Sequence, residues 1–354
     1  MANRDVRPRV LFICGTMNHT TQMHQIAREL PECDAWFTPY YCDPPLDWLR
    51  RAGALEFVAL GERHRRRCMS YLQDQALQID LEGTRHAGQY DLVLTASDLI
   101  VPKNVEGTPI VLVQEGMTDP EDWRYSLCRT VKIMPRWAAG SALTGLSLQY
   151  DRFCVASAGY RNLFIGKGVP ADRIVVTGIP NFDNFRRLLE NPFPHKNHVQ
   201  VCTSDLRETL RYDDRAGFLR GVAALAGTRE VIFKLHPNEN EARATREINR
   251  YVPGARVFAE GSAEEMIANA NILVTQLSSV VYVGLALGLE VHSYFDLEEL
   301  KRLLPLQLAR AAANIAEVCR DVMARHRLRR RGNRSHPGDA RYRSEGLQPR
   351  GLPQ

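Results

Sequence analysis

The 354-residue chain is long enough for two domains, and its 44% hydrophobic and 25% charged residues are typical of a globular protein in water. Its formal charge of +5 is unevenly distributed. Nine arginines against two acids give residues 325–354 a charge of +7, which leaves −2 for the rest of the chain. The body of the protein therefore lacks the basic character of a nucleic-acid binder, and we expect no nucleic-acid partner.

Residues 325–354 are also rich in glycine and proline, which predicts a disordered basic tail. A solvated terminus is the simpler interpretation of this tail, and contact with anionic lipid headgroups is the alternative. The eight cysteines are scattered without CxxC or metal-ligand spacing, as reduced thiols of a cytosolic protein are. We expect no signal peptide and no membrane span. The expected location is cytoplasmic, with peripheral contact at the inner face of the membrane as the alternative for the tail.

In chain order, the first half alternates apolar strand-like runs with amphipathic helical segments. The predicted strands cover residues 9–15, 34–41, 56–60, 90–98, 108–116, 151–157 and 173–180. The predicted helices cover residues 21–32, 46–53 and 64–88, with another from Ala158, and residues 117–150 are irregular or helical. Strands that alternate with helices in this way predict a parallel, doubly wound sheet.

A second set of alternating elements follows the proline-containing stretch 181–198, which we interpret as a linker. Its strands are expected at 199–205, 230–237, 255–260, 271–276 and 291–295, and its last helix at 297–325. The fold class is therefore α/β, with two Rossmann-like parallel-sheet domains that face each other across a cleft. The expected domains are residues 1–180 and 199–324, and the tail is 325–354.

Two strand ends of the second domain carry polar residues suited to an anionic ligand, because open α/β sheets bind ligands at the carboxyl ends of their strands. The first is the loop of Lys234, His236 and Pro237. The second is the turn of Thr275, Gln276, Ser278 and Ser279, where the two serines are natural N-caps of the following helix. Together they predict a site for a nucleotide diphosphate; the alternatives are a surface histidine in the first loop and simple capping in the second.

Three side chains of the first domain are candidates for the general base. Glu115 follows the apolar run 110–113, and burial there is expected to raise its pKa. Asp98 ends the preceding strand in the same way, and His19 lies in the loop after the first strand. Ordinary structural roles are the alternative for each of these residues, and the sequence does not choose between them.

Further candidate ligand contacts lie in three loops at strand ends. Gly15 and Asn18 belong to the first loop, where Asn18 or Thr20 alternatively caps the first helix. Gly178 permits a tight turn or a close approach of the backbone. The remaining candidates are Asn181 at the domain junction, where packing of a hinge is the alternative, and Thr203, Ser204 and Arg207 in the second domain, where Arg207 alternatively pairs with nearby acids.

A basic and apolar patch over residues 129–139 is a candidate for docking on a membrane surface, and burial in the core is the simpler alternative. No Asp-x-Asp motif stands at a strand end, so we expect neither a metal nor another cofactor.

The order of four short motifs resembles the GT-B superfamily over about residues 8–300. These motifs are KLHPN at one strand end, TQLSS at a later one, VTGIPNFDN at the domain junction and VQEG in the first domain. The nearest branch is that of the nonhydrolysing UDP-N-acetylglucosamine 2-epimerases and related glycosyltransferases, with lipid A disaccharide synthase and the polymer glycerophosphotransferases. The resemblance implies that Glu115 faces the cleft, that His236 contacts the donor and that Ser278 and Ser279 bind its diphosphate.

The chain departs from the epimerases where their helix after the Ser-Gly-Gly stretch carries acidic residues, because here that helix reads SVVYVGLALG. This difference counts against an epimerase and leaves the ribose contact unassigned. The epimerases also have a first-domain loop rich in arginine and acids where this chain has TMNHT at residues 16–20. This loop and the hydrophobic stretch 131–147 look more like those of a transferase that accepts a bulky partner. We therefore expect an inverting, metal-independent transfer of a sugar from a nucleotide diphosphate, most simply UDP, to a hydroxyl of a glycan or lipid-linked acceptor. The alternatives are a UDP-N-acetylglucosamine 2-epimerase, a glycerophosphotransferase and a non-catalytic nucleotide-sugar binding protein.

Overall fold

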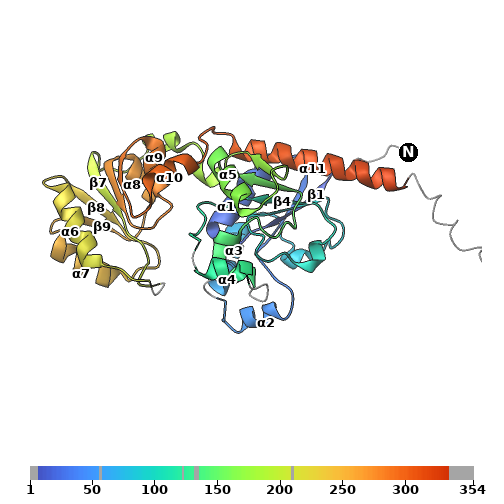
Figure 1. The fold of residues 1–354 in the computed structure, drawn as a ribbon, viewed down its shortest axis with the longest axis horizontal. Coiled ribbons are helices and arrows are strands. Elements are labelled where there is room, and N and C mark those ends of the chain that lie inside the picture. Colours follow the sequence, from blue (N-terminus) through green and yellow to red (C-terminus); the bar gives the residue numbers. More distant parts are fainter. Residues whose placement is uncertain (1–6, 56–57, 122, 131–134, 209–210, 335–354) are drawn as a thin grey trace, which may run out of the picture.

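The chain folds around two parallel β-sheets, each built from one half of the sequence (Figure 1). The computed structural model describes residues 7–55, 58–121, 123–130, 135–208 and 211–334. The first sheet has six strands in the order β2-β1-β3-β4-β5-β6, and the second has five in the order β11-β10-β7-β8-β9. In both sheets, the order of the strands changes direction next to the strand that comes first in the sequence. In sheets of this kind, ligand sites gather at that point, at the carboxyl ends of the strands.

The first sheet contains strands where the apolar runs of the first half predict them. The strands are β1 (Arg9–Ile13), β2 (Asp34–Thr38), β3 (Leu92–Thr95), β4 (Ile110–Val113), β5 (Arg152–Val155) and β6 (Ile174–Val176). The helices are α1 (Met17–Arg28), α2 (Leu46–Arg51), α3 (Glu62–Asp74), α4 (Trp123–Thr130) and α5 (Ala158–Lys167). Short 3₁₀ segments η1 (Leu81–Gly83), η2 (Lys103–Val105) and η3 (Arg136–Leu143) fill the connections.

The second sheet repeats the pattern after the 3₁₀ segments η4 (Pro180–Phe182) and η5 (Phe185–Leu189). Its strands are β7 (His198–Cys202), β8 (Val231–Lys234), β9 (Arg256–Phe258), β10 (Ala270–Thr275) and β11 (Glu290–His292). Its helices are α6 (Arg215–Ala226), α7 (Glu241–Tyr251), α8 (Ala263–Ala268) and α9 (Val281–Leu287). Helix α10 (Leu297–Leu303) then leads back toward the first domain and precedes α11 (Ala311–Arg334).

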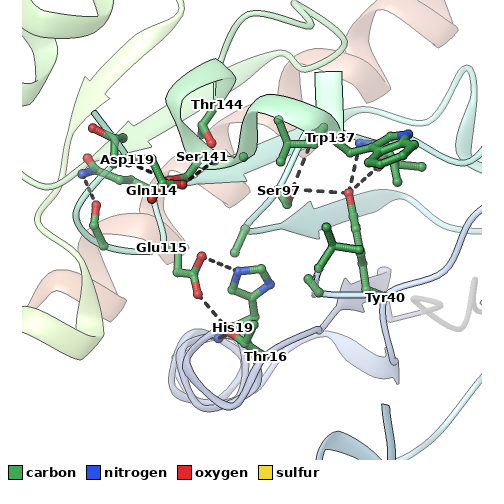
Figure 2. Close-up of a pocket in the computed structure, with 18 of the residues that line it drawn as sticks. Thr16, His19, Tyr40, Ser97, Gln114, Glu115, Asp119, Trp137, Ser141 and Thr144 are labelled. Carbon is green, nitrogen blue, oxygen red and sulfur yellow. Dashed lines mark hydrogen bonds and ion pairs between the residues drawn. The ribbon is translucent and has the colours of Figure 1, made fainter. Parts of the chain in front are cut away.

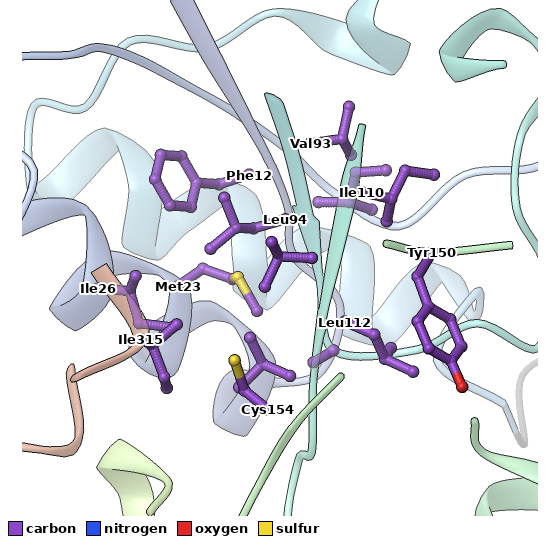
Figure 3. Close-up of a cluster of buried hydrophobic side chains, with 14 of the residues drawn as sticks. Phe12, Met23, Ile26, Val93, Leu94, Ile110, Leu112, Tyr150, Cys154 and Ile315 are labelled. Atoms are coloured by element: carbon purple, nitrogen blue, oxygen red, sulfur yellow. The ribbon is translucent and has the colours of Figure 1, made fainter. Parts of the chain in front are cut away.

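The core of the first domain is closed by the far end of the chain (Figure 3). Phe12, Leu94 and Leu112 from the central strands pack with Met23 of α1 and Ile315 of α11, all buried. Helix α11 therefore completes the first domain, although sequence order places it with the second. It also continues past Arg325 to Arg334, where we had expected a disordered tail.

Three local predictions were wrong for identifiable reasons. The helix expected over 64–88 ends at Asp74, because Ala76 and Glu82 adopt positive φ angles that no helix can contain. Residues 58–60 of the strand expected at 56–60 form turns; Glu56 and Phe57 lie outside the described residues. Helix α1 begins at Met17 and its cap is Thr16, whose side chain accepts the backbone N–H of His19, so neither Asn18 nor Thr20 is the cap.

Candidate active site

The loop after β1 and the loop after β4 bring His19 and Glu115 together (Figure 2). Strands β1 and β4 are both bonded to β3, so their carboxyl ends lie at the same edge of the sheet. The turn from β1 into α1 places His19 in the first turn of that helix, facing the sheet edge. Two of the three candidate bases are therefore adjacent in space although the sequence separates them by almost a hundred residues.

Both oxygens of the Glu115 carboxylate are held by the first loop. Its Oε2 lies 2.7 Å from Nε2 of His19, a short ion-pair contact that is poorly aligned for a hydrogen bond. Its Oε1 accepts the Thr16 hydroxyl at 2.9 Å. His19 is 2% exposed, whereas the Glu115 side chain is 34% exposed, so the carboxylate is the member of the pair that a ligand can reach.

The pKa of Glu115 is lowered, contrary to the expectation that burial would raise it. Burial does act to raise this pKa, but the electrostatic influence of His19 and the hydrogen bond from the Thr16 hydroxyl together outweigh burial. Glu115 is therefore ionised throughout the neutral pH range. In this state it can accept a proton or stabilise a developing positive charge, and it cannot serve as a general acid.

Gly15 fixes the position of the His19 ring. A Cβ atom at residue 15 would lie 2.5 Å from Nδ1 of His19, closer than non-bonded atoms approach, so the ring rests directly on the glycine backbone. We expect Gly15→Ala to push the ring away from Glu115 and to lower kcat/KM by roughly 10²-fold, the effect of displacing a reacting group by about 1 Å. The same variant should unfold at nearly the wild-type temperature. An unchanged kcat/KM would show that the position of His19 does not matter.

A pocket of about 280 Å³ opens beside the His19–Glu115 pair. Its walls come from the loops after β1, β2, β3 and β4, from residues 58–60 and from η3. Its lining is largely apolar and aromatic, with Tyr40, Val58, Leu60, Leu99, Ile100, Met117 and Trp137. Trp137, part of the predicted membrane patch, thus lines this pocket, while residues 131–134 of that patch lie outside the described residues.

Asp98, the third candidate base, does not join this pair. It is 2% exposed, and its carboxylate accepts the backbone N–H groups of Gly145 at 2.9 Å and of Ser147 at 3.0 Å. Both oxygens therefore hold the loop between η3 and β5. The position of Asp98 favours its structural interpretation.

The Lys234 ammonium does not point toward an anion site at the end of β8. Its Nζ donates to the carbonyls of Leu235 at 2.9 Å and Ala259 at 2.7 Å. His236 next to it is about one-third exposed, and its Nδ1 lies 3.6 Å from the Asp205 carboxylate. Pro237 is exposed in the same loop. Of the three residues predicted here, His236 is the one that offers a polar side chain to a ligand.

Thr203 and Arg207 enter an ionic network, of which the sequence predicted only the pairing of Arg207 with nearby acids, as an alternative. Arg207 binds Glu247 through two hydrogen bonds of 2.9 and 2.6 Å, and it lies 3.3 Å from Asp213. The Thr203 hydroxyl donates to Glu239, and Arg215 bridges Asp213 and Glu239. Arg207 thus pairs with nearby acids, the alternative to binding phosphate. The signal available in the sequence was the acids close to Arg207, such as Asp213, whereas Glu239 and Glu247 are brought to the network by tertiary contacts.

The turn after β10 is built partly as expected. Thr275 and Gln276 are buried, and their side chains bond to the Cys202 carbonyl at 3.0 Å and to Asp213 at 2.8 Å. Ser278 and Ser279 are half-buried, and within the described part of the chain neither hydroxyl has a partner. They do not cap α9, since its N-cap is Val280 without a side-chain hydrogen bond. Both hydroxyls therefore remain available to a ligand.

The remaining predicted contacts pack the domain junction or support a turn within one domain. Asn181 donates to the Asn18 carbonyl at 2.7 Å and accepts from Thr21 at 3.3 Å, which fastens the domain junction to α1. Gly178 has a φ of +76°, and a Cβ there would lie 3.1 Å from Cβ of Ala311. The buried Ser204 hydroxyl accepts the Leu277 N–H at 3.3 Å and supports the turn after β10. These residues thus act in packing rather than in an open pocket.

Among the residues described, no helix combines the length and the apolar character needed to cross a membrane.

No protein-family model and no curated protein matches the chain. Solved structures do match it, at low sequence identity. The UDP-GlcNAc 2-epimerase from Neisseria meningitidis, bound to UDP-GlcNAc, is 13% identical with a TM-score of 0.51, covering 88% of this chain and 100% of that chain.

Two further structures point to the same architecture. The UDP-N-acetylglucosamine 2-epimerase from Rickettsia bellii is 12% identical, with a TM-score of 0.51, covering 94% of this chain and 99% of that chain. A variant of the wall teichoic acid polymerase TagF is 9% identical, with a TM-score of 0.52, covering 91% of this chain and 90% of that chain. Identities this low establish the fold alone. The chain has a GT-B-like fold of two Rossmann-like domains, as the sequence predicts.

Proposed function

We propose that this protein is an enzyme that acts on a nucleotide-diphosphate sugar and transfers the sugar to a hydroxyl acceptor. The observation that carries the proposal is an ionised Glu115, held by His19 and Thr16, in the wall of a largely apolar pocket of the first domain. A transferase needs such a pocket for its acceptor, whereas an enzyme that rearranges the sugar in place does not. The GT-B-like fold supports the nucleotide sugar as the donor class, since the structure from Neisseria meningitidis holds UDP-GlcNAc.

In this mechanism the acceptor hydroxyl attacks the anomeric carbon while the bond from that carbon to the diphosphate oxygen breaks. Glu115 takes the hydroxyl proton, and the nucleotide diphosphate leaves. Because the pKa of Glu115 is lowered, it is a weak base, and the proton must move late, when the new C–O bond has made the acceptor oxygen acidic. The Ser278 and Ser279 hydroxyls and His236 are the groups we assign to the departing diphosphate.

A UDP-N-acetylglucosamine 2-epimerase is the second candidate. The matched epimerases resemble this chain in fold over nearly its whole length, and an ionised Glu115 beside His19 is equally suited to removing a proton from a sugar carbon. Because the chain also resembles TagF in fold, a glycerophosphotransferase remains an alternative. We favour the transferase because the lining of the pocket next to the pair is largely apolar and aromatic, which suits an acceptor better than a sugar alone.

Two experiments test the proposal. A thermal-shift panel of UDP, GDP, CDP and dTDP sugars should raise the unfolding temperature with at least one nucleotide, because a ligand that binds only the folded state stabilises it. A shift with none of them would remove the donor class. The enzyme should then be given UDP-N-acetylglucosamine alone and the sugar followed by NMR; formation of an epimer without release of UDP would establish the epimerase instead.

A further inference from the structure

Helix α9 belongs to the cores of both domains. Val281 and Tyr282 are fully buried in the hydrophobic cluster of the first domain. The next residue, Val283, belongs with Leu273 and Phe185 to a separate cluster on the second sheet. The helix starts directly after Ser278 and Ser279, so the turn assigned to the diphosphate is attached to the element that joins the two domains.

The Tyr282 hydroxyl meets the hydroxyl of Tyr160, on α5 of the first domain, at 2.8 Å. Both side chains are at most 1% exposed. Burial raises the pKa of Tyr282 to about 12 and raises that of Tyr160 as well, so both are neutral phenols across the physiological range. A buried hydroxyl without a partner is costly, and each of these hydroxyls has the other as a partner across the domain boundary.

Tyr160 extends this contact toward the reactive pair. Tyr160 lines a cavity together with Thr118, and Thr118 also lines the pocket beside Glu115. The path therefore runs from the turn at Ser278 and Ser279 through Tyr282 and Tyr160 to a cavity next to the loop that carries Glu115.

The elements at both ends of this path are closely packed against their neighbours. A Cβ at Gly284 would lie 2.7 Å from Leu273, so α9 rests closely on β10. The ring of Phe182 meets Tyr282 edge-to-face with 5.9 Å between centroids, and a Cβ at Gly116 would lie 3.1 Å from that same Phe182 ring. With α9 fixed on the second sheet and Phe182 against the loop of Glu115, a displacement of the tyrosine pair must move one domain relative to the other.

We propose that the Tyr160–Tyr282 hydroxyl pair is a positioning contact that sets where the Ser278–Ser279 turn lies relative to the loop of Glu115. The importance of that placement for turnover rests on the proposed function, whereas the contact itself does not. The pair joins two domains by an uncharged hydrogen bond in an apolar surrounding, where a lost partner cannot be replaced by water without opening the interface.

Hydrogen exchange of the ligand-free protein tests the contact without any assay of activity. Tyr160→Phe leaves the Tyr282 hydroxyl unpaired, and we expect the amides of α9 and the Thr118 loop to exchange on the order of tenfold faster. Tyr282→Phe leaves the Tyr160 hydroxyl without its partner in the same way, and we expect an effect of the same order. The double variant Tyr160→Phe, Tyr282→Phe has no hydroxyl that lacks a partner. The factor by which it speeds amide exchange should therefore be smaller than the product of the factors measured for the two single variants.

Tyr212→Phe is the matched control, since that side chain is 89% exposed on the second domain, and its exchange should equal the wild type. Unchanged exchange in both single variants, or effects that simply multiply in the double variant, would overturn the proposal. If the wild type turns over a nucleotide sugar, Tyr160→Phe should lower kcat while the Kd for that nucleotide sugar stays the same. If the wild type shows no turnover, the proposed function is rejected, and the exchange experiment alone decides whether the Tyr160–Tyr282 pair is a positioning contact.

Discussion

Replacing His19 by glutamine is expected to lower kcat/KM for sugar transfer by roughly 10²–10⁴-fold, the range that a positioned proton-transfer system contributes. His19 is the buried partner that lies 2.7 Å from Glu115, and its charge is the main influence that lowers the Glu115 pKa. Without it, the carboxylate loses one of its two supports and its orientation toward the pocket. Steady-state kinetics of nucleotide release with the substrates found in the binding panel measure the effect.

His24→Gln is the matched control for this variant, because it makes the same substitution on the same helix. His24 contacts the Tyr71 hydroxyl at 3.0 Å and does not line the pocket. It should retain nearly wild-type activity. Because His19 and Glu115 act as a unit, the double variant His19→Gln, Glu115→Gln should be no slower than the slower single variant. Effects that multiply would show that the two residues work independently.

The second large effect is expected in stability, at the contact of α5 with α10. A Cβ at Gly159 would lie 2.0 Å from the Arg302 carbonyl oxygen, and backbone atoms cannot turn aside as a side chain does. Gly159→Ala should therefore push α10 off α5 and break the 2.9 Å bond from the Ser157 hydroxyl to the Leu303 carbonyl. Overpacking of this kind costs about 1–3 kcal/mol or more, measured as a loss in the free energy of unfolding in urea.

Gly166→Ala, in the same helix, should change the free energy of unfolding in the opposite direction. Nothing lies within 4 Å of a Cβ at residue 166, and alanine favours helix over glycine by about 1 kcal/mol. This variant should be slightly more stable than the wild type. If both alanine variants changed stability equally, the close approach of α5 and α10 would not exist in solution.

The fold was predictable because periodicity alone identifies most of its elements. Apolar runs such as Ile110–Val113 are bounded by polar loops and read as buried parallel strands. The path of α11 was not predictable in this way. Its buried residues, including Ile315 and Cys319, are typical of any amphipathic helix, and nothing in their pattern indicates which of two cores they join. Tertiary packing decides that question.

The candidate site was predictable to the level of residue types. His19 and Glu115 were both candidate bases because each follows a strand of the parallel sheet, but they were alternatives to each other, and the sequence did not indicate that they meet. The direction of the Glu115 pKa shift was not predictable, since it depends on whether a cation reaches the buried carboxylate. The sequence likewise did not indicate that Lys234 would turn to backbone carbonyls, because a lysine at a strand end can point either way.

The central claim is that sugar transfer takes place at Glu115, and one comparison tests it most directly. Wild type and Glu115→Gln are saturated with the nucleotide sugar that stabilises them, acceptor is added, and release of the nucleotide diphosphate is followed over time. Glutamine keeps the size of the side chain and can keep the hydrogen bond from Thr16, but it cannot take a proton. We expect both proteins to bind the nucleotide sugar with the same Kd and the variant to release nucleotide at least 10²-fold more slowly. Equal rates of release would show that Glu115 does not take part in the transfer.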